Sequence, residues 1–169
     1  TLLIETGRAE EGLPVLKKAV ALADEEAMPY AGLGHHYFRE YEASQSEEER
    51  RRLADEAASY YTMALQRNSK CIEAMIPLSL LQVQAPDATP EDIRNGMILA
   101  EKACEYSKYS NPSAMLNLAD IYHMTGHPFE AMKAADLALE IAVQMGNDEL
   151  ISLIRAKQAA IARGGTIIK

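Results

Sequence analysis

The chain has 169 residues, of which 48% are hydrophobic and only 6% are aromatic. This length suits one extended domain or a few stacked repeats, and the many Ala and Leu residues favour close-packed helices over a β-sandwich. The net charge of −8, from 25 acidic and 17 basic residues, argues against a dedicated nucleic-acid surface, which needs clustered basic side chains. The one basic run, at residues 50–52, directly follows three glutamates.

The cysteines indicate the redox environment. Cys71 and Cys104 are isolated and form no CxxC pair, which indicates buried thiols in an intracellular, reducing compartment rather than a disulfide framework. No apolar stretch is long enough to span a membrane, and no signal peptide is recognisable. The chain starts without Met and in the middle of a repeat, so we expect it to be a fragment of a longer protein.

Residues 1–24 are expected to form a partial repeat. Gly7, Gly12, Leu16 and Ala19 take the loop and second-helix positions of the repeats that follow. We therefore expect residues 1–4 to be the end of a first helix, with Thr1 already inside it. A second helix should run from about residue 8 to residue 24, because proline is tolerated near a helix start, as at Pro14.

Residues 27–69 predict a complete helical hairpin. The first helix carries a stripe of large and small residues at Tyr30, Leu33, Gly34 and Tyr37, and the second carries Ala57, Tyr61 and Ala64. The interval from Gly34 to Ala57 is 11 residues longer than the matching interval in the last repeat, and the extra residues fall within 42–52. We expect an exposed inserted loop there, followed by an early helix start, because Ser46 and Glu49 resemble a capping box.

Residues 70–108 predict a degenerate hairpin. Met75, Leu78 and Ser79 match the first-helix stripe, but Gln82 replaces its tyrosine and Pro77 should kink the helix or delay its start. The sequence from Thr89 to Asp92 is a strong helix start, because it combines a cap, a proline and acids at the positive end of the helix dipole. Small residues then follow in the second helix at Gly96, Ala100 and Ala103.

Residues 111–145 predict the most regular hairpin. Its first helix opens with Asn111-Pro112 and carries the stripe Met115, Leu118, Ala119 and Tyr122; its second carries Ala131, Ala135 and Ala138. These spacings are those of the tetratricopeptide repeat (TPR), in which small residues let two antiparallel helices approach closely. Since one hairpin cannot bury its own apolar face, the whole chain is expected to be all-α, a right-handed TPR superhelix or α-solenoid.

Residues 147–163 predict one more amphipathic helix after an Asn147 cap. Its stripe does not match the TPR pattern cleanly. It is either the first helix of a next repeat or a cap over the last apolar face.

A more specific series runs through the third and fourth repeats. It comprises Asn68-Ser69-Lys70-Cys71, Ala74, Leu78, Leu81, Ile93, Asn95-Gly96 and Ala103, then Ser110-Asn111-Pro112, Leu116-Asn117-Leu118-Ala119 and Tyr122. In order and spacing this series resembles the TPR scaffold subunit of the polymerase-associated factor (PAF) complex, which accompanies RNA polymerase II in transcription elongation. The resemblance covers about residues 2–142 and is sharpest over residues 68–122; the insertion at 42–52 and the sequence after Met145 depart from it.

The resemblance implies a nuclear, non-catalytic scaffold. It implies that PAF-complex subunits are the partners and that the array links elongation to histone modification. It assigns no contact residue, because it consists of packing positions.

The predicted groove residues come from the helix periodicity. In a TPR array the first helix of each hairpin lines the concave face. The positions between the packing stripes are therefore groove candidates: Ala31, His35, Phe38, Arg39, Ile76, Leu80, Val83, Gln84, Leu116, Asp120, His123 and Met124. We select nine of them as partner-binding candidates: His35, Phe38, Arg39, Ile76, Leu80, Val83, Leu116, Asp120 and His123.

The chemistry of these positions favours an apolar ligand. Some chaperone-binding TPR proteins hold a C-terminal carboxylate with Lys, Arg and Asn, whereas the corresponding positions here are Ala31, His35, Ile76 and Leu80. An exposed apolar patch of this kind marks a protein contact. We therefore expect an apolar helix or an extended segment of a partner to bind to Phe38, Ile76, Leu80 and Leu116. The alternative is that a helix of the missing chain covers the same residues.

No catalytic, cofactor or metal site is predicted. Of the adjacent His35 and His36, only His36 has an acidic or histidine residue at i+4, Glu40, and His127 is expected as a cap or turn residue at a helix start. No nucleotide-binding, nucleophile-elbow or zinc-protease motif occurs. We expect no direct contact with nucleic acid or membrane. Two alternatives to the PAF scaffold remain: an unrelated TPR adaptor, and the TPR arm of an enzyme whose catalytic domain lies in the missing chain.

Overall fold

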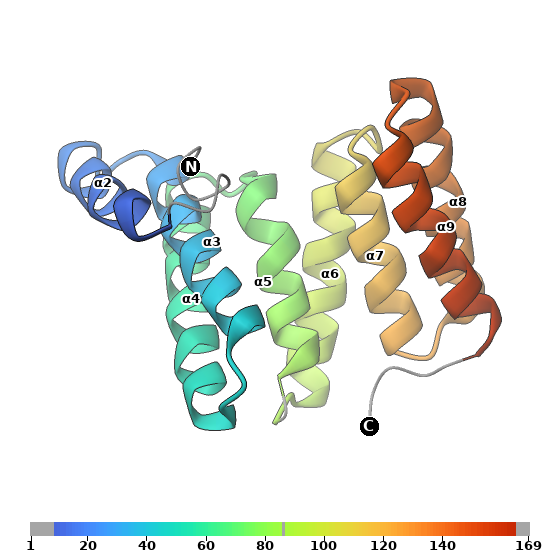
Figure 1. The fold of residues 1–169 in the computed structure, drawn as a ribbon, viewed down its shortest axis with the longest axis horizontal. Helices are drawn as coiled ribbons and strands as arrows, with labels where there is room; N and C mark the ends of the chain where they lie inside the picture. The colour runs from blue at the N-terminus through green and yellow to red at the C-terminus, as the bar shows by residue number, and fades with distance from the viewer. Residues whose placement is uncertain (1–8, 86, 165–169) are drawn as a thin grey trace. The chain divides into compact units, whose positions relative to one another are not determined.

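The computed structural model describes residues 9–85 and 87–164. Within these residues it contains only helices, labelled as in Figure 1: α2 (Ala9–Leu22), α3 (Ala27–Ala43), α4 (Glu47–Arg67), α5 (Ile72–Gln84), α6 (Pro90–Tyr106), α7 (Pro112–Met124), α8 (Pro128–Met145) and α9 (Asp148–Ala162). The predicted all-α fold of antiparallel hairpins is confirmed. The expectations for residues 1–8, including a helical Thr1, lie outside the described residues. None of the described helices has the length and apolar character to cross a membrane.

The helices form two compact units, Thr1–Leu78 and Ser79–Lys169, each described by itself. In the first unit, α3 and α4 lie antiparallel and pack along their length, as the predicted hairpin requires (Figure 1). Their contact depends on Gly34. A Cβ at this position would lie 2.6 Å from the ring of Tyr61, whose side chain is fully buried. Only glycine lets the two helices approach this closely.

The predicted loop 42–52 is largely helical. Residues 44–46 alone connect α3 to α4, and the remaining extra residues lengthen both helices to 17 and 21 residues. The cause is local: the Ser46 side chain accepts a hydrogen bond from the Glu49 backbone N–H at 3.4 Å, and three glutamates occupy the positive first turn. Arg50 then stacks 4.4 Å from the centroid of the Tyr41 ring on α3. The polar run thus starts a helix and extends the hairpin.

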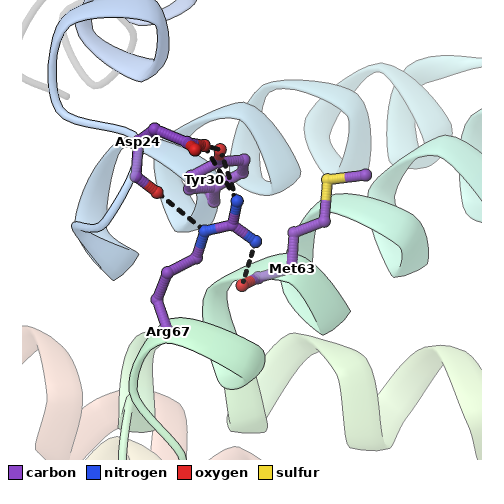
Figure 2. Close-up of polar contacts among 4 residues, drawn as sticks. All are labelled: Asp24, Tyr30, Met63 and Arg67. Carbon is purple, nitrogen blue, oxygen red and sulfur yellow. Dashed lines mark hydrogen bonds and ion pairs between the residues drawn. The ribbon is translucent and has the colours of Figure 1, made fainter.

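Arg67, at the end of α4, ties the α2–α3 connection to the hairpin (Figure 2). Its guanidinium lies 4.1 Å from the centroid of the Tyr30 ring and donates to the Asp24 carboxylate at 2.9 Å. It also donates to the backbone carbonyls of Asp24 and Met63 at 2.8 and 3.4 Å. The Tyr30 hydroxyl donates to the same carboxylate, and this bond, with the Arg67 guanidinium, lowers the pKa of Asp24. A planar fork of five donors suits this arrangement, which lysine could not reproduce.

In the second unit, the predicted helix starts are present. Thr89 and Asp92 form a reciprocal capping box at α6. The Asn111 side chain accepts from two backbone N–H groups at the start of α7, and Asn147 caps α9. The sequence predicts a kink or a delayed helix start at Pro77, and the delay does not occur, since α5 begins at Ile72, within the first unit.

Small residues also hold the second unit together. Ala119 of α7 and Ala131, Ala135 and Ala138 of α8 are completely buried. A Cβ at Gly96 of α6 would lie 2.8 Å from the backbone oxygen of Ser79 on α5. The predicted packing positions of the third and fourth repeats therefore lie where the helices come closest.

Replacing Gly34 with alanine tests the close approach in the first unit. Alanine normally favours a helix over glycine by about 1 kcal/mol. Here the new methyl group would meet a buried, rigid ring, so we expect Gly34→Ala to destabilise the protein by about 1–3 kcal/mol. The urea midpoint of unfolding measures the change.

Gly32→Ala is the matched control. Its new Cβ would meet the end of the Leu16 side chain at 2.7 Å, and a terminal methyl group can shift more easily than the fully buried ring of Tyr61. We expect a clearly smaller loss of stability for this variant than for Gly34→Ala. Equal effects of the two substitutions would contradict the proposed role of Gly34.

Candidate functional site

The predicted groove residues of the first unit differ in exposure. Ala31 is completely buried and belongs to the core, whereas His35, Phe38 and Ile76 are half-buried and Arg39 is exposed. Phe38 therefore presents part of its ring to solvent from the first helix of a hairpin. Its ring packs against that of Tyr41 one turn later, with centroids 5.8 Å apart. Arg50 of α4 stacks on Tyr41, so the contact between α3 and α4 holds the ring against which Phe38 packs.

His35 is held by the second helix of the same hairpin. Its Nδ1 atom lies 2.9 Å from the Tyr61 hydroxyl, and the two rings meet edge to face with centroids 5.4 Å apart. Burial raises the pKa of Tyr61 well above its ordinary value, so its hydroxyl stays protonated. The orientation of His35 is thus fixed by α4, and its ring remains partly exposed.

In the second unit most of the predicted groove residues are buried. Val83, Leu116 and His123 are 4%, 7% and 6% exposed, and Met124 is also buried. Leu80 and Asp120 are half-buried, and Gln84 is exposed. The Gln84 amide donates to the sulfur of Met124 at 3.7 Å, which joins the ends of α5 and α7. Leu80 is therefore the apolar residue of this set that a partner could reach in the second unit.

Asp120 is used within the fold. Its carboxylate accepts a hydrogen bond from Lys157 Nζ of α9 at 2.5 Å. Burial raises the pKa of Asp120, although the Lys157 ammonium opposes the shift. The next residue of α9, Gln158, donates to Asp136 of α8 at 2.7 Å. Adjacent residues of α9 thus bind both helices of the preceding hairpin, and Asp120 positions α9.

Two buried polar side chains were not singled out from the sequence. Asn117 of α7 is 4% exposed and donates to the Ser79 hydroxyl of α5 at 2.8 Å. Ser79 is completely buried. The repeat pattern indicates only a small packing residue at Ser79, and Asn117 enters only through the family resemblance. The sequence does place the amide of Asn117 in the middle of an apolar helix. Because a buried polar group needs a hydrogen-bond partner, this position could have been identified as one that contacts another helix.

The structure offers little for metal or nucleophilic chemistry. No three His, Cys, Asp or Glu side chains gather as a metal site in residues 9–85 and 87–164. Cys71 and Cys104 are buried free thiols, as expected. Burial raises the pKa of both thiols, that of Cys104 to about 11, so neither is an activated nucleophile.

Comparison with solved structures supports the fold. The chain is similar to the crystal structure of a thermophilic TPR protein from Thermus thermophilus, with a TM-score of 0.75. The match covers 92% of this chain and 75% of that chain at 18% sequence identity. No family model and no curated protein matches the sequence. At this identity the likeness establishes a TPR-like arrangement of helices and carries no statement about a partner.

The burial of Leu116 predicts how it will respond to substitution. Leu116→Asp would bury an unpaired charge, which we expect to destabilise the protein by about 3–5 kcal/mol. Leu80→Asp places the charge at a half-exposed position and should cost about 1 kcal/mol. Thermal unfolding followed by circular dichroism measures both. Equal losses would show that Leu80 is as essential to the core as Leu116.

Proposed function

We propose that this chain is a non-catalytic protein-interaction scaffold that binds its partner through half-exposed apolar side chains of first helices. The observation that carries the proposal is the position of Phe38 and Leu80. Each lies on the first helix of a TPR-like hairpin and remains partly exposed, whereas Leu33 of α3 and Leu78 of α5 are buried. Rigid helices that present apolar side chains bind an amphipathic helix or an extended segment of another protein.

The chemistry of the surface supports a largely apolar ligand. Ala31 is buried, His35 is hydrogen-bonded to Tyr61, and Ile76 and Leu80 are aliphatic. These positions supply no cluster of cations for a terminal carboxylate. Asp120 is paired with Lys157 and Leu116 is buried, so neither is kept as a contact. We propose one contact at His35, Phe38 and Arg39 in the first unit and a second, considered by itself, at Leu80 in the second unit.

We further propose that the scaffold belongs to the PAF complex and acts in the nucleus, in RNA polymerase II elongation and linked histone modification. The support is the residue series that begins at Asn68 and ends at Tyr122, which resembles the TPR subunit of that complex. The proposed partners are other subunits of the complex.

An unrelated TPR adaptor is the second candidate. It is favoured by the burial of the residues that carry the resemblance. Ala74, Ala103 and Ala119 are completely buried, and Leu78, Leu81 and Leu118 are 6% exposed. Side chains in such positions serve helix packing, which every TPR array needs whatever it binds.

Affinity capture separates the two candidates. The full-length protein, tagged and captured from nuclear extract, should recover PAF-complex subunits and RNA polymerase II by mass spectrometry. Phe38→Ala combined with Leu80→Ala should lower this recovery at least tenfold, since apolar anchors contribute most of the affinity at such contacts. Unfolding midpoints of the variants show whether the fold is retained.

Phe129→Ala is the matched control, because Phe129 is 78% exposed but lies on a second helix, α8. Its recovery of partners should equal that of the unaltered protein. Recovery of chaperones or cytoplasmic proteins alone would favour the unrelated adaptor. An undiminished recovery by the Phe38 and Leu80 variant would contradict the proposed binding surface.

A further inference from the structure

His36 lies in the contact between α2 and α3. Gly32, one turn earlier on α3, directly faces the Leu16 side chain of α2. Leu33 and Leu16 form a buried apolar cluster, bordered by Leu13, Val20 and Tyr60. Residues three and four apart share a face of a helix, so His36 follows Leu33 and Gly32 on the face that meets α2. Its side chain is 9% exposed.

The surroundings of His36 suit a neutral imidazole. Its Nδ1 atom is buried and has no hydrogen-bond partner among the described residues, and the ring lies edge to face against Tyr37. A protonated ring would place an N–H donor at this atom with no acceptor. Burying a donor or a charge without a partner is costly.

The charges around His36 come from three helices. Lys17 faces it from α2, and Arg39 and Glu40 lie near it on α3. On α4, Tyr60 borders the same apolar cluster, and the Glu56 carboxylate acts on the Tyr60 hydroxyl. Burial is the main cause that lowers the pKa of His36; Glu40 opposes the shift, and the two cations add to it.

We propose that the packing of α2 on α3 is pH-sensitive and that His36 is the titrating group. Protonation of His36 loosens α2 and exposes the apolar cluster of Leu16 and Leu33, while the α3–α4 hairpin keeps its structure. His36 itself is not one of the proposed partner-binding residues, although Arg39, which lies near it, is.

The direction of the effect follows from the two protonation states. In the detached state the imidazole titrates near its ordinary pKa of about 6.5. In the packed state its pKa is lower, so at acidic pH the detached state binds more protons. The stability of the α2–α3 contact is therefore complete above about pH 6.5 and falls as the pH drops below that value.

Hydrogen exchange of the unaltered chain tests the proposal. After correction for intrinsic exchange rates, amide protection in α2 should fall by up to about tenfold between about pH 7.5 and about pH 5.5. Protection in the centre of α4 should change much less. An equal loss of protection in both helices, or none in α2, would overturn the proposal.

His36→Gln provides the matched control, because glutamine is polar but stays neutral over this range. The pH dependence of protection in α2 should disappear in this variant, and a dependence equal to that of the unaltered chain would overturn the proposal. If the variant fails to fold, the NMR titration of His36 in the unaltered chain decides the question. An imidazole pKa at or above about 6.5 contradicts the proposal, and a lower value supports it.

Discussion

The close approach of paired helices is the constraint on which the rest of the structure depends. In the first unit it depends on Gly34, which leaves room for the buried ring of Tyr61. In the second unit it depends on Ala119 of α7 and on Ala131, Ala135 and Ala138 of α8, which are completely buried. A single hairpin cannot bury its own apolar face, so each hairpin must pack against a neighbouring hairpin. Small residues at the contacts allow this packing. A larger side chain at these positions would push the helices apart.

This packing determines which side chains stay exposed to solvent and are therefore available to bind a partner. On α3 the stripe of Tyr30, Leu33 and Gly34 is buried, while Phe38 and Arg39 keep exposed surface. On α7 the division is different, because Leu116 and His123 are also buried and Asp120 holds α9. The proposed partner therefore meets rigid helices whose accessible residues are few, and specificity would come from these few side chains.

Much of the fold could be predicted from the sequence, because its signals are local. The caps at Thr89 and Asn111 and the small residues at Gly34 and Ala119 each act within one helix or one hairpin. The extent of the loop at 42–52 could not be predicted, since a charged run suits both a solvated loop and a capped helix. Contacts between helices that are distant in the sequence could not be predicted either. The Lys157–Asp120 ion pair and the Asn117–Ser79 hydrogen bond join residues that are 37 and 38 positions apart. Periodicity placed Leu116 on the groove side but could not tell how much of it neighbouring helices cover.

In the proposed mode of binding, first-helix side chains with residual exposure contact the partner, while second helices support them. Hydroxyl-radical footprinting of the captured complex tests this claim most directly, because it reports the solvent exposure of individual side chains. The bound partner should lower the oxidation of Phe38 on α3 and Leu80 on α5, while the exposed Phe129 on α8 and Ile98 on α6 keep their reactivity. Protection confined to α4, α6 and α8, with Phe38 and Leu80 unchanged, would contradict it.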